Sequence, residues 1–185
     1  MMRPSVTRGI VLCVVAAVAA AASLGAQPTL EYNVKAALLL NFARFIEWPA
    51  GAFRDASAPI DVCVLAANPF GDALERATQG ETIDNRPIAT RLVSGQADSA
   101  GCHLLFVPAG TESRARGVLQ QAATHTVTIG ESRRFEDMGG AVTLVIDGGR
   151  VGFTVNLRPV EQRGIRISAR MLQLARRVDR ATPEK

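Results

Sequence analysis

The sequence is poor in the residues that most often carry chemistry. It has two histidines and three cysteines among 185 residues, and aromatic residues make up 5%. A zinc site needs three or four ligands at characteristic spacing, whereas His103 and His125 are the only imidazoles. We therefore expect no metal site and no bound cofactor.

Signatures of catalysis are also missing. The chain has no Gly-x-Ser-x-Gly, no phosphate-binding glycine loop, no dinucleotide fingerprint and no His-Glu-x-x-His. Acidic pairs such as Glu136-Asp137 are interpreted as a solvated helix face, and Glu47 as a surface residue near a helix end. These absences favour a binding protein over an enzyme and predict no catalytic residues.

The charge is close to balanced and contains no block of one sign. There are 21 basic and 17 acidic residues, a formal net charge of +4. If Arg3 and Arg8 leave with a leader, 19 basic residues face 17 acidic ones and the net charge falls to +2. We therefore expect no nucleic-acid partner.

The first residues have the pattern of a cleavable signal peptide. Arg3 and Arg8 precede an apolar stretch over residues 9–22, and small residues follow it up to Ala26. The alternative is a membrane anchor, but the stretch is shorter than the roughly 20 residues that span a bilayer. We expect cleavage after Ala26 and export of the rest.

Two cysteines remain after such cleavage, because Cys13 lies in the leader. Cys63 and Cys102 form an even pair in an oxidising compartment, where a disulfide is the default. Closing a loop of this length stabilises a fold by roughly 4 kcal/mol in the chain-entropy model. A metal pair or a redox pair are the alternatives, although the spacing is not Cys-x-x-Cys.

The mature part starts with a long helical pattern. Thr29 is a candidate N-cap. An apolar stripe follows at helical spacing, and the chain leaves the helix at Trp48-Pro49 because a residue before proline avoids the α region. The stripe consists of Val34, Leu38, Phe42, Phe45 and Ile46. Further apolar residues make the helix apolar almost all round, so the domain or a partner must bury more than one side.

The rest of the chain predicts one α/β domain over residues 27–180 and a frayed tail over 181–185. Short apolar strands alternate with helices, which favours a mainly parallel sheet with helices on both faces. The predicted strands are 60–65, 88–93, 102–107 and 126–129. Residues 142–146 and 151–155 flank Asp-Gly-Gly-Arg, a β-hairpin signal. A final helix capped by Ser168 is expected to run through Val178.

Two features have both a structural and an interaction reading. Trp48-Pro49 either packs into the hydrophobic core or forms part of an association surface. The arginines between Arg158 and Arg180 either form a solvated helix face or bind an anion or an acidic partner surface. Tryptophan and arginine are common interface anchors. We therefore take Trp48, Pro49, Arg170 and Arg177 as the candidate partner interface.

Several blocks together resemble the YfiR family of periplasmic regulatory proteins. The resemblance spans roughly residues 29–178, and no single block is a catalytic signature. The order and spacing of the blocks carry it. The blocks are residues 32–49, residues 62–65, residues 68–71, residues 102–107 and residues 149–156, followed by Ser168 and Leu172.

The resemblance implies a repressor of an inner-membrane diguanylate cyclase. Such a protein binds the periplasmic sensor domain of the cyclase, lowers cyclic-di-GMP and reduces biofilm formation, and an outer-membrane lipoprotein releases it in some systems. The resemblance also implies a Cys63–Cys102 bridge and a homodimer. A second disulfide of some relatives has no cysteines here.

Two other classes of function stay open from the sequence. The first is a small-molecule-binding sensor that acts on another membrane signalling protein. Its ligand would lie at the loops Ala66–Gly71 and Pro108–Ser113, because α/β sheets bind ligands at the carboxyl ends of their strands. An exported enzyme with an unrecognised site is the remaining class.

Overall fold

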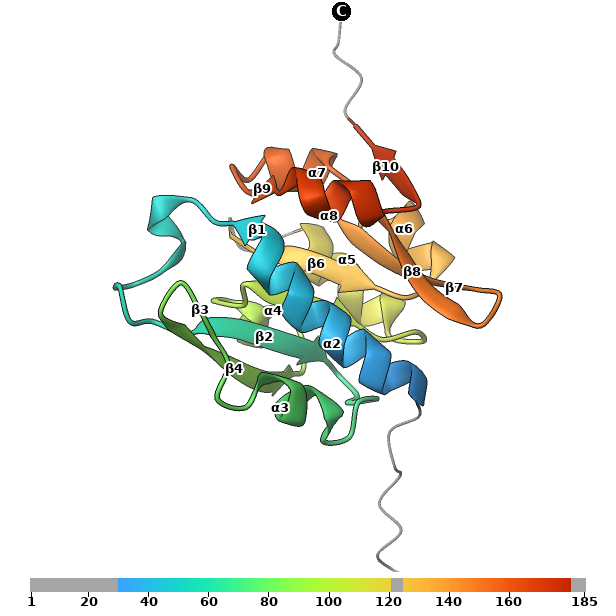
Figure 1. Cartoon of the computed structure of the whole chain (residues 1–185). Helices are drawn as coiled ribbons and strands as arrows, with labels where there is room; N and C mark the ends of the chain where they lie inside the picture. The colour runs from blue at the N-terminus through green and yellow to red at the C-terminus, as the bar shows by residue number, and fades with distance from the viewer. Residues whose placement is uncertain (1–29, 121–124, 181–185) are drawn as a thin grey trace, which may run out of the picture.

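The fold is described for residues 30–120 and 125–180 of a computed structural model (Figure 1). The expected signal peptide over residues 1–26, the candidate cap Thr29 and the tail over residues 181–185 lie outside the described residues. Within the described ranges, no helix has both the length and the apolar character needed to cross a membrane.

A single large sheet forms the centre of the domain. Its strand order is β10-β8-β7-β6-β5-β2-β4-β3, and the strands from β7 to β4 in this order run parallel to one another. The mainly parallel sheet expected from the alternating pattern is thus confirmed. The parallel strands are β2 (Ile60–Leu65), β4 (Arg86–Val93), β5 (Leu104–Val107), β6 (Val127–Gly130) and β7 (Val142–Asp147).

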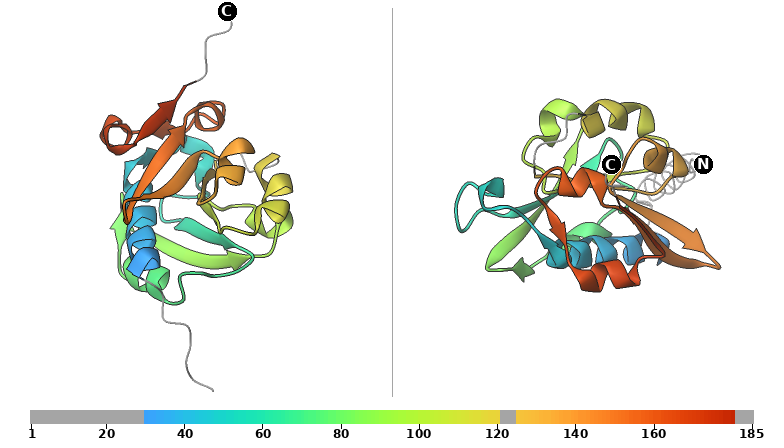
Figure 2. Two further views of the ribbon diagram at one scale, coloured as in Figure 1. Left: turned by 90° about the vertical axis from the view of Figure 1, so that its right-hand side faces the viewer. Right: turned by 90° about the horizontal axis from the view of Figure 1, so that it is seen from above.

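Helices cover both faces of this sheet, as the sequence predicts (Figure 2). One face carries α2 (Leu30–Phe45), α3 (Ala73–Thr78) and α8 (Ala169–Leu174), and the other carries α4 (Gln96–Ser99), α5 (Glu112–Gln120) and α6 (Arg133–Asp137). Each face has its own hydrophobic core. Phe106 belongs to the first core and its neighbour Leu105 to the second, because successive side chains of a strand point to opposite faces.

Cys63 and Cys102 form the disulfide, and the bridge lies in the second core. Cys63 is in β2 and Cys102 stands just before β5, with the Cα atoms 5.9 Å apart. Both residues are fully buried. The bridge therefore staples two neighbouring strands across 39 residues of chain.

Helix α2 lies diagonally across its face of the sheet (Figure 1). Phe42 is buried as predicted and packs edge-on against Phe153, with ring centroids 4.9 Å apart. The predicted stripe is wrong at Val34, which is 40% exposed, while its neighbour Lys35 is 3% exposed. Lys35 turns inward because it forms ion pairs, described below, that hydrophobicity alone does not reveal.

The predicted hairpin is confirmed. Strand β7 pairs antiparallel with β8 (Arg150–Asn156). The turn between them has Gly148 at φ 55° and Gly149 at φ 74°, and two successive positive φ values are what a type I′ turn requires. Glycine adopts this conformation without steric cost.

The final helix is shorter than predicted. The Ser168 hydroxyl accepts a hydrogen bond from the Met171 N–H at 3.4 Å, so the expected cap is present. The helix ends at Leu174 because Ala175 is extended, with ψ at 139°. Residues Arg177–Asp179 then form β10, which pairs parallel with β8. Val178 therefore lies in an edge strand, and the expectation that it continues the helix is wrong.

The remaining elements are short. Strand β1 (Ile46–Glu47) pairs antiparallel with β9 (Arg166–Ile167) in a separate small sheet at the end of α2. The others are the 3-10 helix η2 (Ala50–Ala52), strand β3 (Thr82–Ile83) and helix α7 (Arg158–Glu161). Elements of two to four residues leave almost no periodic signal in a sequence, and these were not predicted.

Candidate interaction surface

Trp48 lies at the corner where the chain leaves α2 and β1. Its side chain is half-buried, and its Nε1–H donates a hydrogen bond to the His125 carbonyl oxygen at 3.0 Å. The indole also meets the His103 ring edge-on, with centroids 5.8 Å apart. Trp48 therefore anchors the corner to the sheet and still presents part of its ring at the surface, as does the half-buried Pro49.

His103 holds the segment that follows this corner. Its Nδ1 accepts a hydrogen bond from the Asp61 N–H at 3.0 Å, and its Nε2 lies 3.1 Å from the Ala52 carbonyl oxygen. An acceptor at Nδ1 and a carbonyl at Nε2 fit the neutral tautomer with the proton on Nε2. Burial lowers the pKa of His103, and this outweighs the opposing effects of the Ala52 hydrogen bond and of Asp61.

A stack of three groups extends from His103 to the surface. The Phe53 ring stacks on the imidazole with centroids 4.4 Å apart, and the Cζ atom of the Arg86 guanidinium lies 3.8 Å from the Phe53 centroid. Arg86 also donates hydrogen bonds to the carbonyl oxygens of Asp55 and Ala58. Residues 50–58 are thus held as a defined arm beside Trp48.

The two candidate arginines have different surroundings. Arg170 is exposed on α8, and among the described residues no acid pairs with it. Arg177 forms ion pairs with Glu136 and with Asp179, the latter at 2.9 Å. Arg170 is therefore the freer of the two for an acidic partner.

The structure brings together three of the four candidate residues. Strands β1 and β9 pair, and the Ser168 N–H bonds to the Phe45 carbonyl oxygen at 2.9 Å, so the start of α8 lies beside the end of α2. Trp48, Pro49 and Arg170 therefore flank the same small sheet. Arg177 lies on β10, at the far end of α8 and at the edge of the large sheet.

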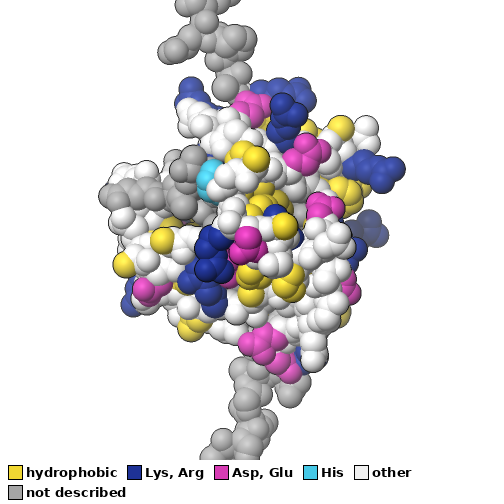
Figure 3. All heavy atoms as spheres, turned by 90° about the vertical axis from the view of Figure 1, so that its left-hand side faces the viewer, with side chains coloured by type: hydrophobic (Ala, Val, Ile, Leu, Met, Phe, Trp, Pro, Cys, Tyr) yellow, Lys and Arg dark blue, Asp and Glu magenta, His cyan; other side chains and the backbone are white. Residues whose placement is uncertain are grey.

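The surface around the arm is mixed in character. Figure 3 shows the side of the molecule that carries η2 and β3, where basic, acidic and hydrophobic side chains are interspersed. A mixed surface of this kind fits a protein partner better than a polyanion.

An apolar groove at the start of α2 was not predicted. It measures about 480 Å³ and lies between α2 and the tip of the β7–β8 hairpin. Leu30 and Ile146, which are 80% and 54% exposed, line it together with Val34 and Val151. The sequence did not indicate this groove because its helical spacing places Val34 in the buried stripe of α2.

Side chains fill the place where this kind of sheet usually binds a ligand. Strands β4-β2-β5-β6-β7 have the 2-1-3-4-5 order, whose ligand crevice lies between the carboxyl ends of β2 and β5. Here Tyr32 of α2 meets Phe70, from the loop after β2, with ring centroids 5.4 Å apart. Tyr32 of α2 therefore packs on the loop after β2, whereas Ala109 and Gly110 of the loop after β5 are exposed.

A buried ionic cluster lies beside the contact between Tyr32 and Phe70. Glu131, which follows β6, accepts hydrogen bonds from the Tyr32 hydroxyl at 3.0 Å and the Ala109 N–H at 2.9 Å. Lys35 pairs with both Glu131 and Glu31. Burial and the neighbouring Glu131 raise the pKa of Tyr32, so its phenol remains a donor. The cluster fixes α2 to the sheet.

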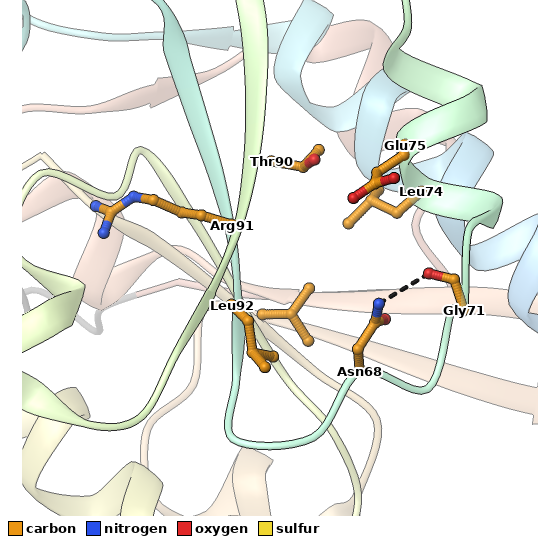
Figure 4. Close-up of a pocket in the computed structure, with 8 residues that line it drawn as sticks. Asn68, Gly71, Leu74, Glu75, Thr90, Arg91 and Leu92 are labelled. Carbon is orange, nitrogen blue, oxygen red and sulfur yellow. Dashed lines mark hydrogen bonds between the residues drawn. The ribbon is translucent and has the colours of Figure 1, made fainter.

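The cavity nearest to these loops is small. It measures about 110 Å³ and opens between α3 and β4, where the Asn68 side chain bonds to the Gly71 carbonyl and Leu74 and Leu92 belong to the lining (Figure 4). Pockets for drug-sized ligands measure roughly 300–1,000 Å³. Among the described residues, no group of three or more His, Cys, Asp or Glu is placed to hold a metal ion.

Two solved structures resemble this chain in part. A conserved domain protein from Vibrio cholerae O1 biovar El Tor matches with a TM-score of 0.54 at 11% identity, over 80% of this chain and 60% of that one. The chain therefore spans less than two thirds of that protein. A domain from Streptococcus pneumoniae in complex with L-Trp gives a TM-score of 0.45 at 15% identity, over 64% of this chain and 54% of that one. The first likeness supports the fold alone.

The family is shown by a sequence match rather than by these structures. The model of the YfiR/HmsC-like family matches residues 32–176. This range starts in α2, includes every strand from β1 to β9 and ends just before β10. The chain belongs to the YfiR/HmsC-like family.

Proposed function

We propose that this protein is a periplasmic regulator that represses an inner-membrane diguanylate cyclase by binding its periplasmic sensor domain. Cyclic-di-GMP and biofilm formation fall as a result. The observation that carries the proposal is the family match over residues 32–176. In this account the chain works by binding and not by catalysis.

The expected location agrees with the chemistry of the cysteines. A signal peptide over residues 1–26 would deliver the domain to the periplasm, where disulfides form and persist. The Cys63–Cys102 bridge is fully buried between two strands of the sheet. A structural bridge of this kind suits a stable domain that functions by binding a partner through its outer surface.

Repression through binding requires a difference in affinity. The regulator shifts the cyclase toward its inactive state only by as much as it binds that state more tightly. We propose that Trp48, Pro49 and Arg170 contribute to this surface, since they flank one small sheet and combine aromatic, apolar and cationic groups. Arg177, although expected at the interface from the sequence, has acidic partners within the chain.

Two further partners belong to the proposal. A homodimer is the expected assembly, and an outer-membrane lipoprotein is the expected agent of release. Both come from the resemblance to YfiR proteins. Release would act by competing for the same surface or by stabilising the free regulator.

The proposal is tested by co-purification. The mature chain, residues 27–185, is mixed with the purified periplasmic domain of a membrane diguanylate cyclase from the same organism. We expect a stable complex on size-exclusion chromatography. A dissociation constant above about 10 μM would be too weak for stable repression. Separate elution of the two proteins at concentrations well above this value would contradict the proposal.

A small-molecule sensor that acts on another membrane signalling protein is the second candidate. The groove beside Leu30 and Ile146 favours it, because its size, about 480 Å³, suits a small apolar ligand. Thermal-shift screening separates the two functions. A metabolite that strongly stabilises the wild type but not an Ile146→Glu variant would favour the sensor.

A further inference from the structure

Strand β7 has an open edge near the tip of the hairpin. It pairs with β6 only at Val142 and Thr143, whose partners are Ile129 and Gly130. Within the described ranges, the rest of β7 pairs with β8 alone. Figure 1 shows this hairpin projecting from the domain beside the start of α2. A strand edge without a neighbour offers its backbone N–H and C=O groups to another chain.

The free backbone groups of this edge are centred on Ile146. The Asn156 N–H donates to the carbonyl oxygen of Ala141, the residue opposite it, at 2.8 Å. Hydrogen-bonded and non-hydrogen-bonded pairs alternate along an antiparallel ladder, so every second residue from Ala141 to Asp147 bonds to β8. Ile146 falls between these residues and points its N–H and C=O away from β8. Neither group is hydrogen-bonded within the described part of the chain.

The apolar groove of about 480 Å³ lies on one face of this edge. Leu144 belongs to the first core, on the face that carries α2, and Ile146 follows it by two residues. The Ile146 side chain therefore points to the same face, where it lines the groove together with Leu30 and Val34 of α2. A residue paired with Ile146 would place its own side chain on this face, next to the groove.

A polar hollow of about 390 Å³ lies on the other face. Thr143 and Thr154 of the hairpin and Arg133 of α6 line it. The two threonines are 3% and 9% exposed, and their hydroxyls form no hydrogen bond with any described residue. A guest side chain in the hollow would therefore meet two hydroxyl donors that the fold leaves free.

The charges of the polar hollow favour an acidic guest. Lys35 pairs with Glu131, and Arg177 pairs with Glu136. Arg133 is exposed and pairs with no acid in the described ranges. The hollow therefore has one cation left over, and hydrogen bonds from a cation to a carboxylate are among the stronger ones.

We propose that β7 binds an extended segment of a partner protein by strand addition, with an apolar residue opposite Ile146 and an acidic residue directly after it. The segment runs antiparallel to β7, because one residue then exchanges both backbone hydrogen bonds with Ile146. Its apolar side chain fills the groove, and the acidic side chain, opposite Val145, points to Arg133 in the polar hollow. The segment turns away beyond this residue, since Glu131 follows β6 there.

This site is separate from the candidate interface for the cyclase. Trp48 follows the C-terminal end of α2, whereas Ile146 lies beside its N-terminal end. A helix of 16 residues is about 24 Å long, and Figure 1 shows the arm over residues 50–58 and the hairpin on opposite sides of the domain. The inference therefore adds a second binding site and does not depend on the proposed function.

Short synthetic peptides test the proposal. The probe has leucine followed by aspartate between threonines, and fluorescence polarisation measures its binding to the mature chain. We expect N-methylation of the leucine to raise the dissociation constant about tenfold, because it removes the donor to the Ile146 carbonyl. Equal binding by the methylated peptide, or no binding of the probe at concentrations up to about 1 mM, would overturn strand addition.

A charge swap tests the polar hollow. We expect Arg133→Glu to reverse the preference, so that a peptide with lysine after the leucine binds more tightly than the aspartate peptide. Arg134→Glu is the matched control, since Arg134 is exposed on the same helix and lines neither cavity. We expect this control to keep the aspartate preference. The same preference in both variants would overturn the placement of the acidic residue.

Hydrogen exchange of the Ile146 amide locates the peptide. In the free protein we expect this N–H to exchange faster than that of Val145, which bonds to β8. Bound peptide should slow exchange at Ile146. A peptide or metabolite that occupies the groove without protecting Ile146 would overturn the inference.

The variant Ile146→Glu separates this inference from the proposed function. We expect it to lose the peptide and to bind the cyclase domain like the wild type. If it lost both, the claim of a second site would be wrong. If the wild type bound the peptide but no cyclase domain, only the proposed function would fail.

Discussion

The imidazole of His103 lies nearly parallel to the ring of Phe53, with centroids 4.4 Å apart and planes inclined by 16°. This contact joins the arm over residues 50–58 to the start of β5. It places a titratable group at the base of the candidate interaction surface. The arm is therefore expected to respond to pH.

Stability should decrease toward acidic pH. Burial lowers the pKa of His103 in the folded state below its ordinary value of 6.5. The unfolded chain then binds the proton more readily, so the contribution of neutral His103 is complete above pH 6.5 and is lost as the pH falls below it. Urea unfolding at about pH 5 and about pH 8, on either side of the ordinary histidine pKa, measures the difference.

The variant His103→Asn isolates this effect. The amide oxygen of the introduced asparagine is able to accept the hydrogen bond from the Asp61 N–H, and the amide does not titrate. We expect the variant to lose part of the difference between the two pH values. An unchanged difference would assign the pH dependence to other groups.

The ion pair between Lys35 and Glu131 should carry more stability than a surface pair. Both side chains are 4% exposed, and Glu131→Gln would leave the Lys35 ammonium with Glu31 alone. Removing one partner of a buried pair costs about 3 kcal/mol. Chemical denaturation measures the loss.

An exposed pair provides the control. Arg44 and Glu81 pair with side chains 44% and 42% exposed, so Glu81→Gln should cost less than about 1 kcal/mol. Equal losses from Glu81→Gln and Glu131→Gln would contradict the buried cluster.

Gly140 should not tolerate a side chain. A Cβ atom placed there would overlap the Phe135 ring, which is fully buried. We expect Gly140→Ala to lower the free energy of unfolding by about 1–3 kcal/mol. Gly51→Ala serves as the control, because nothing lies within 4 Å of its added Cβ, and its expected change is within about 0.5 kcal/mol.

Charge reversal at Arg170 should weaken binding of the cyclase domain. Arg170 has no acidic partner within the described chain, so an acidic partner surface would meet a free cation. We expect Arg170→Glu to raise the dissociation constant at least about tenfold. Arg114→Glu, at an exposed position of α5 on the opposite face, should bind like the wild type. Equal binding by the two variants would remove Arg170 from the interface.

The sequence predicted the elements whose signals are local. Strand β2 and the β7–β8 hairpin follow from apolar runs and a glycine turn, and the α8 cap follows from Ser168. The burial of Lys35 did not follow, because its partner Glu131 lies 96 residues away. Strand β10 also escaped prediction, since its pairing with β8 outweighs the helical spacing of Leu174 and Val178.

The candidate interaction surface stays a prediction. Tryptophan, proline and arginine stand out as residue types, so Trp48, Pro49 and Arg170 could be named as candidates without a structure. Their neighbourhood depends on the pairing of β1 with β9, two strands of two residues each. The ion pairs of Arg177 and the exposure of Val34 depend on tertiary contacts that no local pattern encodes.

Cyclic-di-GMP in a strain that lacks this protein tests the central claim most directly. The account predicts a rise in cyclic-di-GMP that requires the membrane cyclase and is reversed by the wild-type gene. An unchanged level of cyclic-di-GMP under several growth conditions would contradict it.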